Sequence, residues 1–375
     1  MKSSLTSSEL RTTNRRSVLH TVYEQKKISK QGLAQSLHMS LPTVTQNLKE
    51  LEEMGLIDRR GLYESTGGRK AQIYHFVADA RIAIGVLLLK EFYRIVAVDL
   101  YGQVQHSEII SIPFSRSPEY FRDLADHVNA FADRLEYGSD RILGVCYALQ
   151  GLVSPDGQTV IFGEILGCTG LTLDELQADI HYPCTMIHDT EASATAELWE
   201  QKDLKNAVLL LLTRNFGGAL ITDGSVHHGT ELNSDVIEHM RLYPGGRPCY
   251  CGRQGCIETY CSAHALACDA GEPLDAFFRS LRAGENRQLE IWQTYLKNLA
   301  LAINNIRMLF DSEYIIGGYL LQFMTNQDFE QLTEYVNQEC SFHTSGIHIR
   351  PSVYSDDAAA PGAAISLVKE FLESL

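Results

Sequence analysis

Apolar positions in the first eighty residues recur at the spacing of short amphipathic helices. Residues 14–26 fit one helix, through Val18 and Val22, and Gln31–Leu37 fits a second, shorter one. Residues 1–13 show no comparable pattern, so we expect them to lie outside the ordered structure.

A third helix is expected after the turn that ends at Ser40. Ser40 is a good N-cap, Pro42 suits the first helical turn, and Gly55 suits the end of the helix. The buried stripe of this helix would be Val44, Leu48 and Leu51. Two helices joined by a short turn are typical of a helix-turn-helix.

The opposite face of the third helix carries short polar and basic side chains. Two β-like runs follow, Leu56–Arg59 and Ala71–Val77, with a glycine-rich basic loop between them that reads as a wing. Such groups can reach base edges and phosphates, so we predict a winged helix-turn-helix that binds DNA. The alternative is a helical pair that only packs against another protein. The expected DNA contacts are Ser40, Thr43, Thr45, Gln46, Lys49, Gly67, Gly68, Arg69 and Lys70. Arg11, Arg15 and Arg16 could also reach phosphate.

From Ile82 onward, apolar strands alternate with amphipathic helices. The runs that start at Ile82, Phe92 and Arg141 read as strands, and the segment between the last two reads as a helix. This alternation continues almost to the C-terminus, where the last residues form an apolar-faced helix. It predicts an α/β body, with two lobes because the chain is too long for one core.

Charge separates the head from the body. Residues 1–80 hold twelve Lys or Arg against eight Asp or Glu, a net charge of +4, whereas the rest holds 20 against 39, a net charge of −19. An acidic body repels phosphate, so only the head should contact a duplex. No apolar leader or membrane-length run occurs, which predicts a cytoplasmic protein with no membrane contact.

Three of the nine cysteines lie close together in PCYCGRQGC. Cys249, Cys251 and Cys256 follow His239, and three thiolates with one imidazole match a closed tetrahedral zinc site. The alternative is three free thiols in a surface loop. A site with four protein ligands leaves no open position for water, so the predicted cofactor is one structural zinc ion per chain.

Several segments together resemble the ROK family, which includes transcriptional repressors and sugar kinases. They are ESTGGRK in the wing, HDTEASATAELW, FGGALITDGSVHHG, the cysteine segment EHMRLYPGGRPCYCGRQGCIETYCS and the terminal DDAAAPGAAISLV. The resemblance extends from about residue 14 to the C-terminus. It implies a multidomain α+β chain, in which the winged helix-turn-helix precedes a two-lobed actin-like (ribonuclease-H-like) body.

The domains implied are a DNA-binding head at 1–80, a first lobe at 81–195 joined by a C-terminal helix at 355–375, and a second lobe at 196–354. The resemblance also places the metal on His239, Cys249, Cys251 and Cys256. Sugar contacts in the family fall on positions that here hold Glu164, His188, Asp189, His239 and Glu258.

The sequence departs from the family pattern at the residues for phosphate binding and at those for sugar binding. The first phosphate loop is replaced by Leu87–Glu91, and the second keeps only Gly217 and Gly218, which argues against kinase activity. Val236 stands where the family has a sugar-binding glutamate. Glu164 and His188 would favour a cationic or amino-bearing ligand, or would pair with each other in an empty cleft.

The sequence therefore predicts a transcriptional regulator, a repressor of carbohydrate-related genes, that binds an operator as a homodimer or higher homo-oligomer. A small effector, a sugar or sugar derivative, would control operator affinity from the cleft between the lobes. Three alternatives stay open: an unrelated small ligand, control by a protein partner with no small ligand, and a sugar kinase with a fused head.

Overall fold

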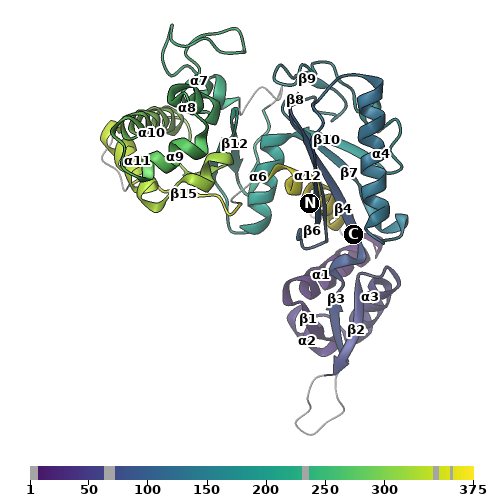
Figure 1. The fold of residues 1–375 in the computed structure, drawn as a ribbon. Coiled ribbons are helices and arrows are strands. Elements are labelled where there is room, and N and C mark those ends of the chain that lie inside the picture. The colour runs from purple at the N-terminus through teal and green to yellow at the C-terminus, as the bar shows by residue number, and fades with distance from the viewer. Residues whose placement is uncertain (1–6, 63–71, 230–235, 341–345, 355–357) are drawn as a thin grey trace.

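The computed structural model describes residues 7–62, 72–229, 236–340, 346–354 and 358–375, and shows a head below a two-lobed body (Figure 1). The predicted wing residues Gly67, Gly68, Arg69 and Lys70 lie outside the described residues. Within the described ranges, none of the helices combines the length and apolar character needed to cross a membrane.

The head is the predicted winged helix-turn-helix. Its elements are α1 (Ser7–Gln25), β1 (Lys27–Ser29), α2 (Lys30–Ser36), α3 (Leu41–Glu53), β2 (Ile57–Leu62) and β3 (Gln72–Phe76), with an antiparallel sheet in the order β1-β3-β2. Ser40 caps α3 by accepting a hydrogen bond from the Thr43 amide, and Gly55 follows the helix with a φ of 72°. The predicted stripe of Val44, Leu48 and Leu51 is buried.

Helix α1 corrects one expectation about the N-terminal segment, since it begins at Ser7 rather than after residue 13. Arg11 pairs with Glu50 of α3, while Arg15 and Arg16 donate to main-chain oxygens at the C-terminal end of the last helix. These contacts connect α1 to the rest of the head and to the body. The phosphate contacts expected of the three arginines stay a prediction.

Each lobe of the body is built around one mixed sheet. The first sheet has the order β10-β7-β4-β5-β6 and the second the order β13-β12-β11-β14-β15. In both, three antiparallel strands come first in sequence, and two later strands run parallel to the first of them, so the lobes repeat one plan. The strands are β4 (Ile82–Leu88), β5 (Tyr93–Val98), β6 (Val104–Ile110), β7 (Ile142–Leu149), β10 (Cys184–His188), β11 (Ala207–Leu212), β12 (Phe216–Thr222), β13 (Ser225–Val226), β14 (Glu313–Gly317) and β15 (Ile349–Pro351).

Helices cover these sheets and connect them, and a small hairpin, β8 (Leu152–Val153) with β9 (Val160–Phe162), extends the first lobe. The α-helices of the body are α4 (Pro118–Arg134), α5 (Leu173–Gln177), α6 (Asp189–Glu200), α7 (Glu258–Cys261), α8 (Ala263–Ala270), α9 (Leu274–Arg282), α10 (Asn286–Arg307), α11 (Asn326–Glu339) and α12 (Ala359–Ser374). Short 3₁₀ helices are η1 (Ala78–Ala80), η2 (Ser139–Arg141), η3 (Ile237–His239) and η4 (Tyr319–Phe323).

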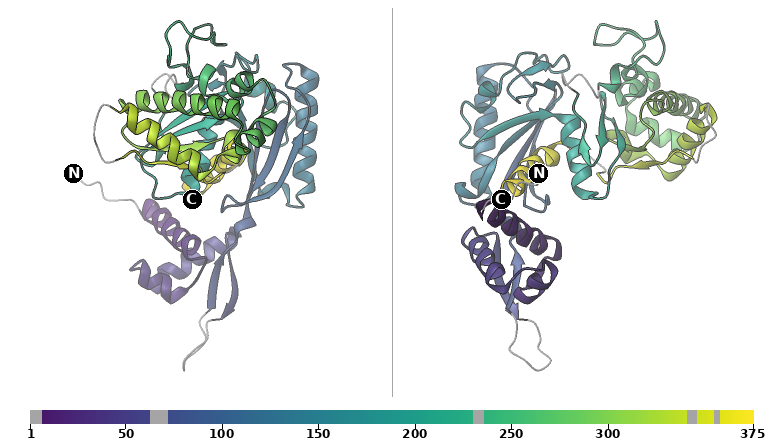
Figure 2. Two further views of the ribbon diagram at one scale, coloured as in Figure 1. Left: turned by 60° about the vertical axis from the view of Figure 1, so that its left-hand side comes forward. Right: turned by 180° about the vertical axis from the view of Figure 1, so that it is seen from behind.

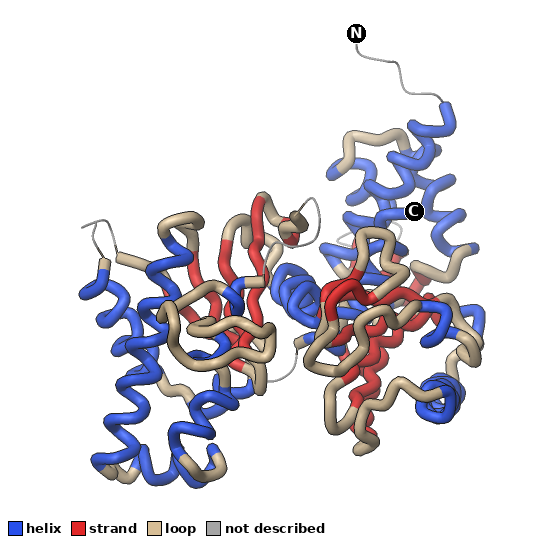
Figure 3. Tube along the Cα trace, turned by 90° about the horizontal axis from the view of Figure 1, so that it is seen from above, coloured by secondary structure: helices blue, strands red, loops and turns tan. Residues whose placement is uncertain are grey.

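Helices α6 and α12 lie between the two sheets, as Figures 2 and 3 show. Helix α12 packs on α6 and on strands β4, β5 and β7, so the last helix of the chain joins the first lobe as expected. The two helices are in close contact at Gly362, where an added Cβ would overlap the carbonyl of Ala192 in α6. Small residues thus let the two helix backbones approach each other.

Gly362→Ala should therefore destabilise the protein by about 1–3 kcal/mol, because the added methyl group forces α6 and α12 apart. Urea denaturation followed by circular dichroism measures this change. Gly346→Ala is the matched control, since no atom lies within 4 Å of a Cβ there. Equal midpoints for the two variants would contradict close packing at Gly362.

Candidate functional site

The cysteine segment forms a tight loop whose backbone gathers three thiols. The Cys249 amide donates to the Arg253 carbonyl and the Gly252 amide to the Cys249 carbonyl, at 2.8 and 3.0 Å. Gly252 and Gly255 have φ values of 81° and 79°, a conformation that favours glycine. The two turns bring side chains from both ends of the segment to one point.

The four predicted metal ligands converge there. The ligand atoms of His239, Cys249, Cys251 and Cys256 all lie within 4.8 Å of one another. Cys249 Sγ is 3.7 Å from His239 Nδ1, and Cys251 Sγ is 3.7 Å from Cys256 Sγ. Tetrahedral zinc with sulfur bonds of about 2.3 Å sets its ligands about 3.8 Å apart, and the two 3.7 Å distances match this spacing.

His239 faces the thiols with one ring nitrogen only. Its Nδ1 is the atom near Cys249, whereas its buried Nε2 has no hydrogen-bond partner among the described residues. The ring meets Phe162 and Tyr250 edge-on, and both of these residues line the cleft. His239 thus stands between the thiol cluster and the cleft wall.

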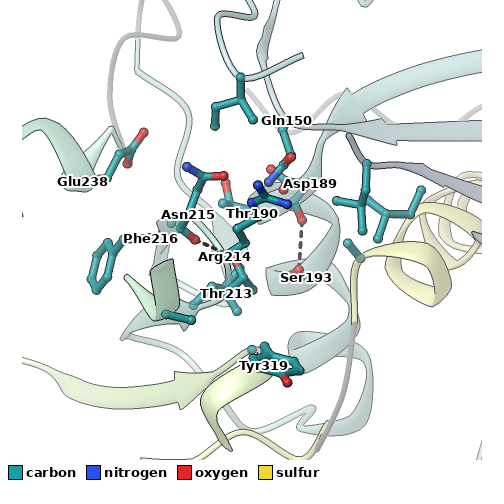
Figure 4. A pocket seen from close by; sticks show the side chains of 18 of the residues that line it. Gln150, Asp189, Thr190, Ser193, Thr213, Arg214, Asn215, Phe216, Glu238 and Tyr319 are labelled. Carbon is teal, nitrogen blue, oxygen red and sulfur yellow. Dashed lines mark hydrogen bonds between the residues drawn. The ribbon is translucent and has the colours of Figure 1, made fainter. Parts of the chain in front are cut away.

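A cavity of about 460 Å³ separates the lobes. Its polar lining residues come from the ends of strands, from loops and from helices such as α6, η3 and α8, and Figure 4 shows several of them turned toward the same space. Of the predicted ligand contacts, Glu164, His188 and Asp189 line it. His239 and Glu258 lie behind its wall, as neither is among the lining residues.

His188 and Asp189 stand where β10 ends and α6 begins. His188 Nε2 lies 3.2 Å from an Asp189 carboxylate oxygen, and its Nδ1 is 2.9 Å from the Thr190 hydroxyl. His188 thus pairs with its neighbours and not with Glu164, which accepts a bond from Thr169. Burial lowers the pKa of His188 to about 4 and raises the pKa of Asp189 to about 7. The imidazole is therefore neutral at neutral pH.

Several polar residues that line the cleft were not predicted from the sequence, and Glu238 and Gln150 are two of them. Glu238, in η3, lines the cavity two residues after Val236, and burial raises its pKa to about 8. Gln150, just after β7, also points into it (Figure 4). The position of Glu238 next to His239 was the available signal, because the short helix η3 that brings His239 to the thiols also brings Glu238 to the cavity.

Glu258 is held by hydrogen bonds within the second lobe. Its carboxylate accepts hydrogen bonds from the Asn215 side chain, at 3.0 Å, and from the Phe216 amide. Burial raises its pKa to about 7, although both hydrogen bonds act in the opposite direction. Glu258 therefore ties α7, which follows the metal loop, to the loop that precedes β12.

The two segments compared with phosphate loops hold bulky side chains at the cleft. Leu87, Leu89 and Lys90 line the cavity on the first lobe, and Arg214 does so on the second. The retained glycines serve packing, since a Cβ at Gly217 would stand 2.8 Å from Thr190 and one at Gly218 would stand 2.9 Å from Ile237.

On the head, four of the nine predicted DNA contacts lie on the outer face of α3. Thr45, Gln46 and Lys49 are exposed, and Thr43 is partly exposed. Several of them also bond locally, since Gln46 donates to Glu50 at 2.9 Å and Lys49 Nζ lies 3.6 Å from Glu53. These exposed bonds are weak and exchange readily for phosphate or base contacts.

Comparison with known proteins assigns the family. The model of the ROK family matches residues 90–370, and the model of the MarR family matches residues 12–62, within the head. The chain belongs to the ROK family. The earlier resemblance and the two-part architecture are therefore confirmed.

Individual relatives are described as transcriptional regulators. The DNA-binding transcriptional dual regulator NagC of Escherichia coli K12 is 28% identical over 244 residues, 64% of this chain and 60% of NagC. The chain thus matches about 60% of the length of the NagC-type relatives. The xylose repressor of Caldicellulosiruptor bescii is 21% identical over 97% of each chain.

Solved structures share the fold. A ROK family transcriptional regulator described as a homologue of the E. coli MLC protein has a TM-score of 0.78, with 22% identity over 97% of this chain and 96% of its own. The ROK hexokinase of Thermus thermophilus has a TM-score of 0.66, with 18% identity over 78% of this chain and 99% of its own. A kinase thus shares the body fold.

The raised pKa of Asp189 predicts a pH-dependent stability. Its pKa is 3.8 when exposed and about 7 when folded, so the stabilising protonated form is lost as the pH rises through 7. Asp189→Asn, which mimics the protonated acid, should therefore change stability little near pH 4. Near pH 8 it should raise the free energy of unfolding by at most about 4 kcal/mol.

Urea denaturation at both pH values measures this difference, and Asp203→Asn on the exposed turn after α6 is the matched control. An Asp189→Asn effect of equal size at both pH values would contradict the buried, protonated carboxyl group.

Proposed function

We propose that this protein is a DNA-binding transcriptional repressor of sugar-related genes whose operator affinity is controlled by a small ligand in the cleft between the lobes. One observation carries the proposal: the same chain has a helix with an exposed polar face in the head and a cleft lined by polar groups in the body. The names of the relatives, N-acetylglucosamine repressor and xylose repressor, favour a sugar or sugar derivative as effector.

Helix α6 supplies a route from the cleft to the head. It begins in the cleft at Asp189, and at its far end the Trp199 indole donates to the Tyr101 carbonyl at 2.8 Å. Lys202, just beyond, pairs with Glu24 of α1 and lies 5.0 Å from the ring of Tyr23. A ligand that displaces the start of α6 would thus shift the contacts through which the far end of α6 holds the head.

The second lobe holds the same helix through one buried carboxylate. Glu197 is fully buried, and it accepts bonds from Arg350 at 3.0 Å and from the Ser352 hydroxyl at 2.7 Å. Movement between the lobes therefore reaches α6 directly. We propose domains at 1–80, 81–195 with 355–375, and 196–354, with α6 crossing the boundary between the lobes.

We propose further that the chain acts as a homodimer or higher homo-oligomer on a pseudo-palindromic operator, as helix-turn-helix proteins do. Kinase activity is not part of this proposal, because leucine and arginine side chains stand where phosphate would need backbone amides. Asp189 would then serve as a ligand contact together with Glu164 and His188, and His239 and Glu258 are proposed as members of the site that act from directly behind the cavity wall.

The direct test is fluorescence anisotropy of the protein against its own promoter DNA, at two salt concentrations, with and without a panel of sugars. Salt-sensitive, sequence-specific binding that one sugar weakens supports the proposal. Specific binding that no sugar changes would favour control by a protein partner. The absence of specific binding would overturn the repressor assignment.

Variants of α3 should separate base contacts from phosphate contacts. Gln46→Ala should weaken operator binding about 5- to 150-fold and leave binding to unrelated DNA nearly unchanged, because a lost base contact costs about 1–3 kcal/mol. Lys49→Ala should weaken binding to both DNAs and lower the salt slope by about 1. Lys205→Ala on the exposed surface of the body is the control. Unchanged operator binding in both α3 variants would contradict the proposed interface.

We propose that the thiol cluster holds one structural zinc ion. The ion would fix the loop between His239 and Glu258, and with four protein ligands it would have no open position for chemistry. Cys251→Ser should therefore lower the zinc content of the dialysed protein from about one ion per chain to near zero and lower its melting temperature. Cys268→Ser, at an exposed cysteine outside the cluster, should keep its zinc. Equal zinc content in the two variants would overturn the assignment.

A further inference from the structure

The cavity between the lobes has two chemically different ends. Gln150, Asp189 and Glu238 gather at one end, and Tyr319 stands apart from them at the other (Figure 4). The polar end is therefore where hydroxyl groups of a sugar find partners.

Apolar side chains from both lobes also line the cavity, beside the charged Lys90, Glu91 and Arg214. Leu89 and Phe92, in the turn between β4 and β5, form the wall on the first lobe. Ala267 of α8, Leu274 of α9 and Tyr319 of η4 form the wall on the second. The Tyr319 side chain is 41% exposed, so its ring is open to a ligand.

The loop before β12 holds these walls in place next to the polar end. The amide of Ala263, at the start of α8, donates to the Thr213 carbonyl at 2.9 Å, and the His264 amide donates to the Arg214 carbonyl at 3.2 Å. Arg214 reaches across the cleft to Glu91, at 3.5 Å, in the same turn as Leu89. One short loop thus divides the cavity into its two parts.

The hydroxyl groups of a free sugar would find hydrogen-bond partners in only one part of this cavity. Hydroxyl groups directed at leucine and alanine side chains would lose their hydrogen bonds to water and gain no replacement, which is unfavourable. An apolar group there is favoured, because it removes both its own surface and that of the walls from water. The rings of Phe92 and Tyr319 suit a planar partner.

We propose that the effector is an amphipathic glycoside, with its sugar at Asp189 and Glu238 and an aromatic aglycone between the Leu89–Phe92 turn and Tyr319. This inference rests on the proposed function and goes beyond it, because it assigns the apolar half of the cleft to a part of the ligand that a free sugar lacks.

Isothermal titration calorimetry of the full chain tests the assignment with methyl and 4-nitrophenyl glycosides of glucose, xylose and N-acetylglucosamine, in both anomers. For at least one sugar, the 4-nitrophenyl glycoside should bind about tenfold tighter or more than its methyl counterpart. The same compound should release promoter DNA in the anisotropy assay at a lower concentration than the methyl glycoside.

Two variants locate the aglycone. Tyr319→Ala should remove most of the preference for the 4-nitrophenyl compound and leave methyl glycoside affinity unchanged, whereas Asp189→Asn should weaken both compounds. Tyr137→Ala, at a tyrosine of the first lobe that does not line the cavity, is the matched control and should keep the preference.

The outcomes separate the two proposals. Equal affinity for methyl and 4-nitrophenyl glycosides would overturn the aglycone site and leave the sugar-controlled repressor intact. Tight binding of 4-nitrophenol alone would also overturn it, because the sugar would then contribute nothing. If no glycoside binds while operator binding is specific, both the aglycone site and control by a cleft ligand fail.

Discussion

The close packing of α6 against α12 is the contact on which the arrangement of the molecule depends. At Gly362 the backbones approach so closely that a side chain has no room, and both helices then lie between the two sheets. The same pair reaches the head, since Arg15 and Arg16 of α1 donate to carbonyls at the end of α12. The cleft, the two lobes and the head are thus joined through one pair of helices. A displacement of the cleft, of either lobe or of the head therefore moves residues that contact α6 or α12.

Burial and charge act against each other in the cleft. Asp189 and Glu238 sit in a cavity with many apolar walls, and burial raises the pKa of each carboxyl well above its usual value. The nearby carboxyl groups of Glu258 and Asp189 raise the pKa of Glu238 further. A ligand that brings hydroxyl donors would relieve this cost, since hydrogen bonds to a carboxylate favour its charged form. The cleft is consequently adapted to a polyhydroxylated group at one end and to an apolar group at the other.

The thiol cluster and the cleft are neighbours for a reason of chain geometry. The segment from η3 to α7 places Glu238 in the cleft, His239 at the thiols and Glu258 on the loop before β12. Fixing the thiols therefore fixes the wall of the cavity, which is how a metal without an open position would contribute to ligand recognition. Glu258 shows the same connection from the other side, because its hydrogen bonds hold the loop that divides the cavity.

Local sequence was sufficient wherever neighbouring residues supply the physical cause. The cap at Ser40, the buried stripe of α3 and the spacing of the cysteines all act over short stretches, so the head and the clustering of the three cysteines with His239 could be predicted from them. Tertiary structure decided the rest. Helix α1 begins at Ser7 because its arginines find partners far away in sequence, and Glu238 belongs to the cleft because the fold of the metal loop turns it there. The apolar half of the cavity gathers residues from both lobes, and no local pattern records which distant side chains will share one space.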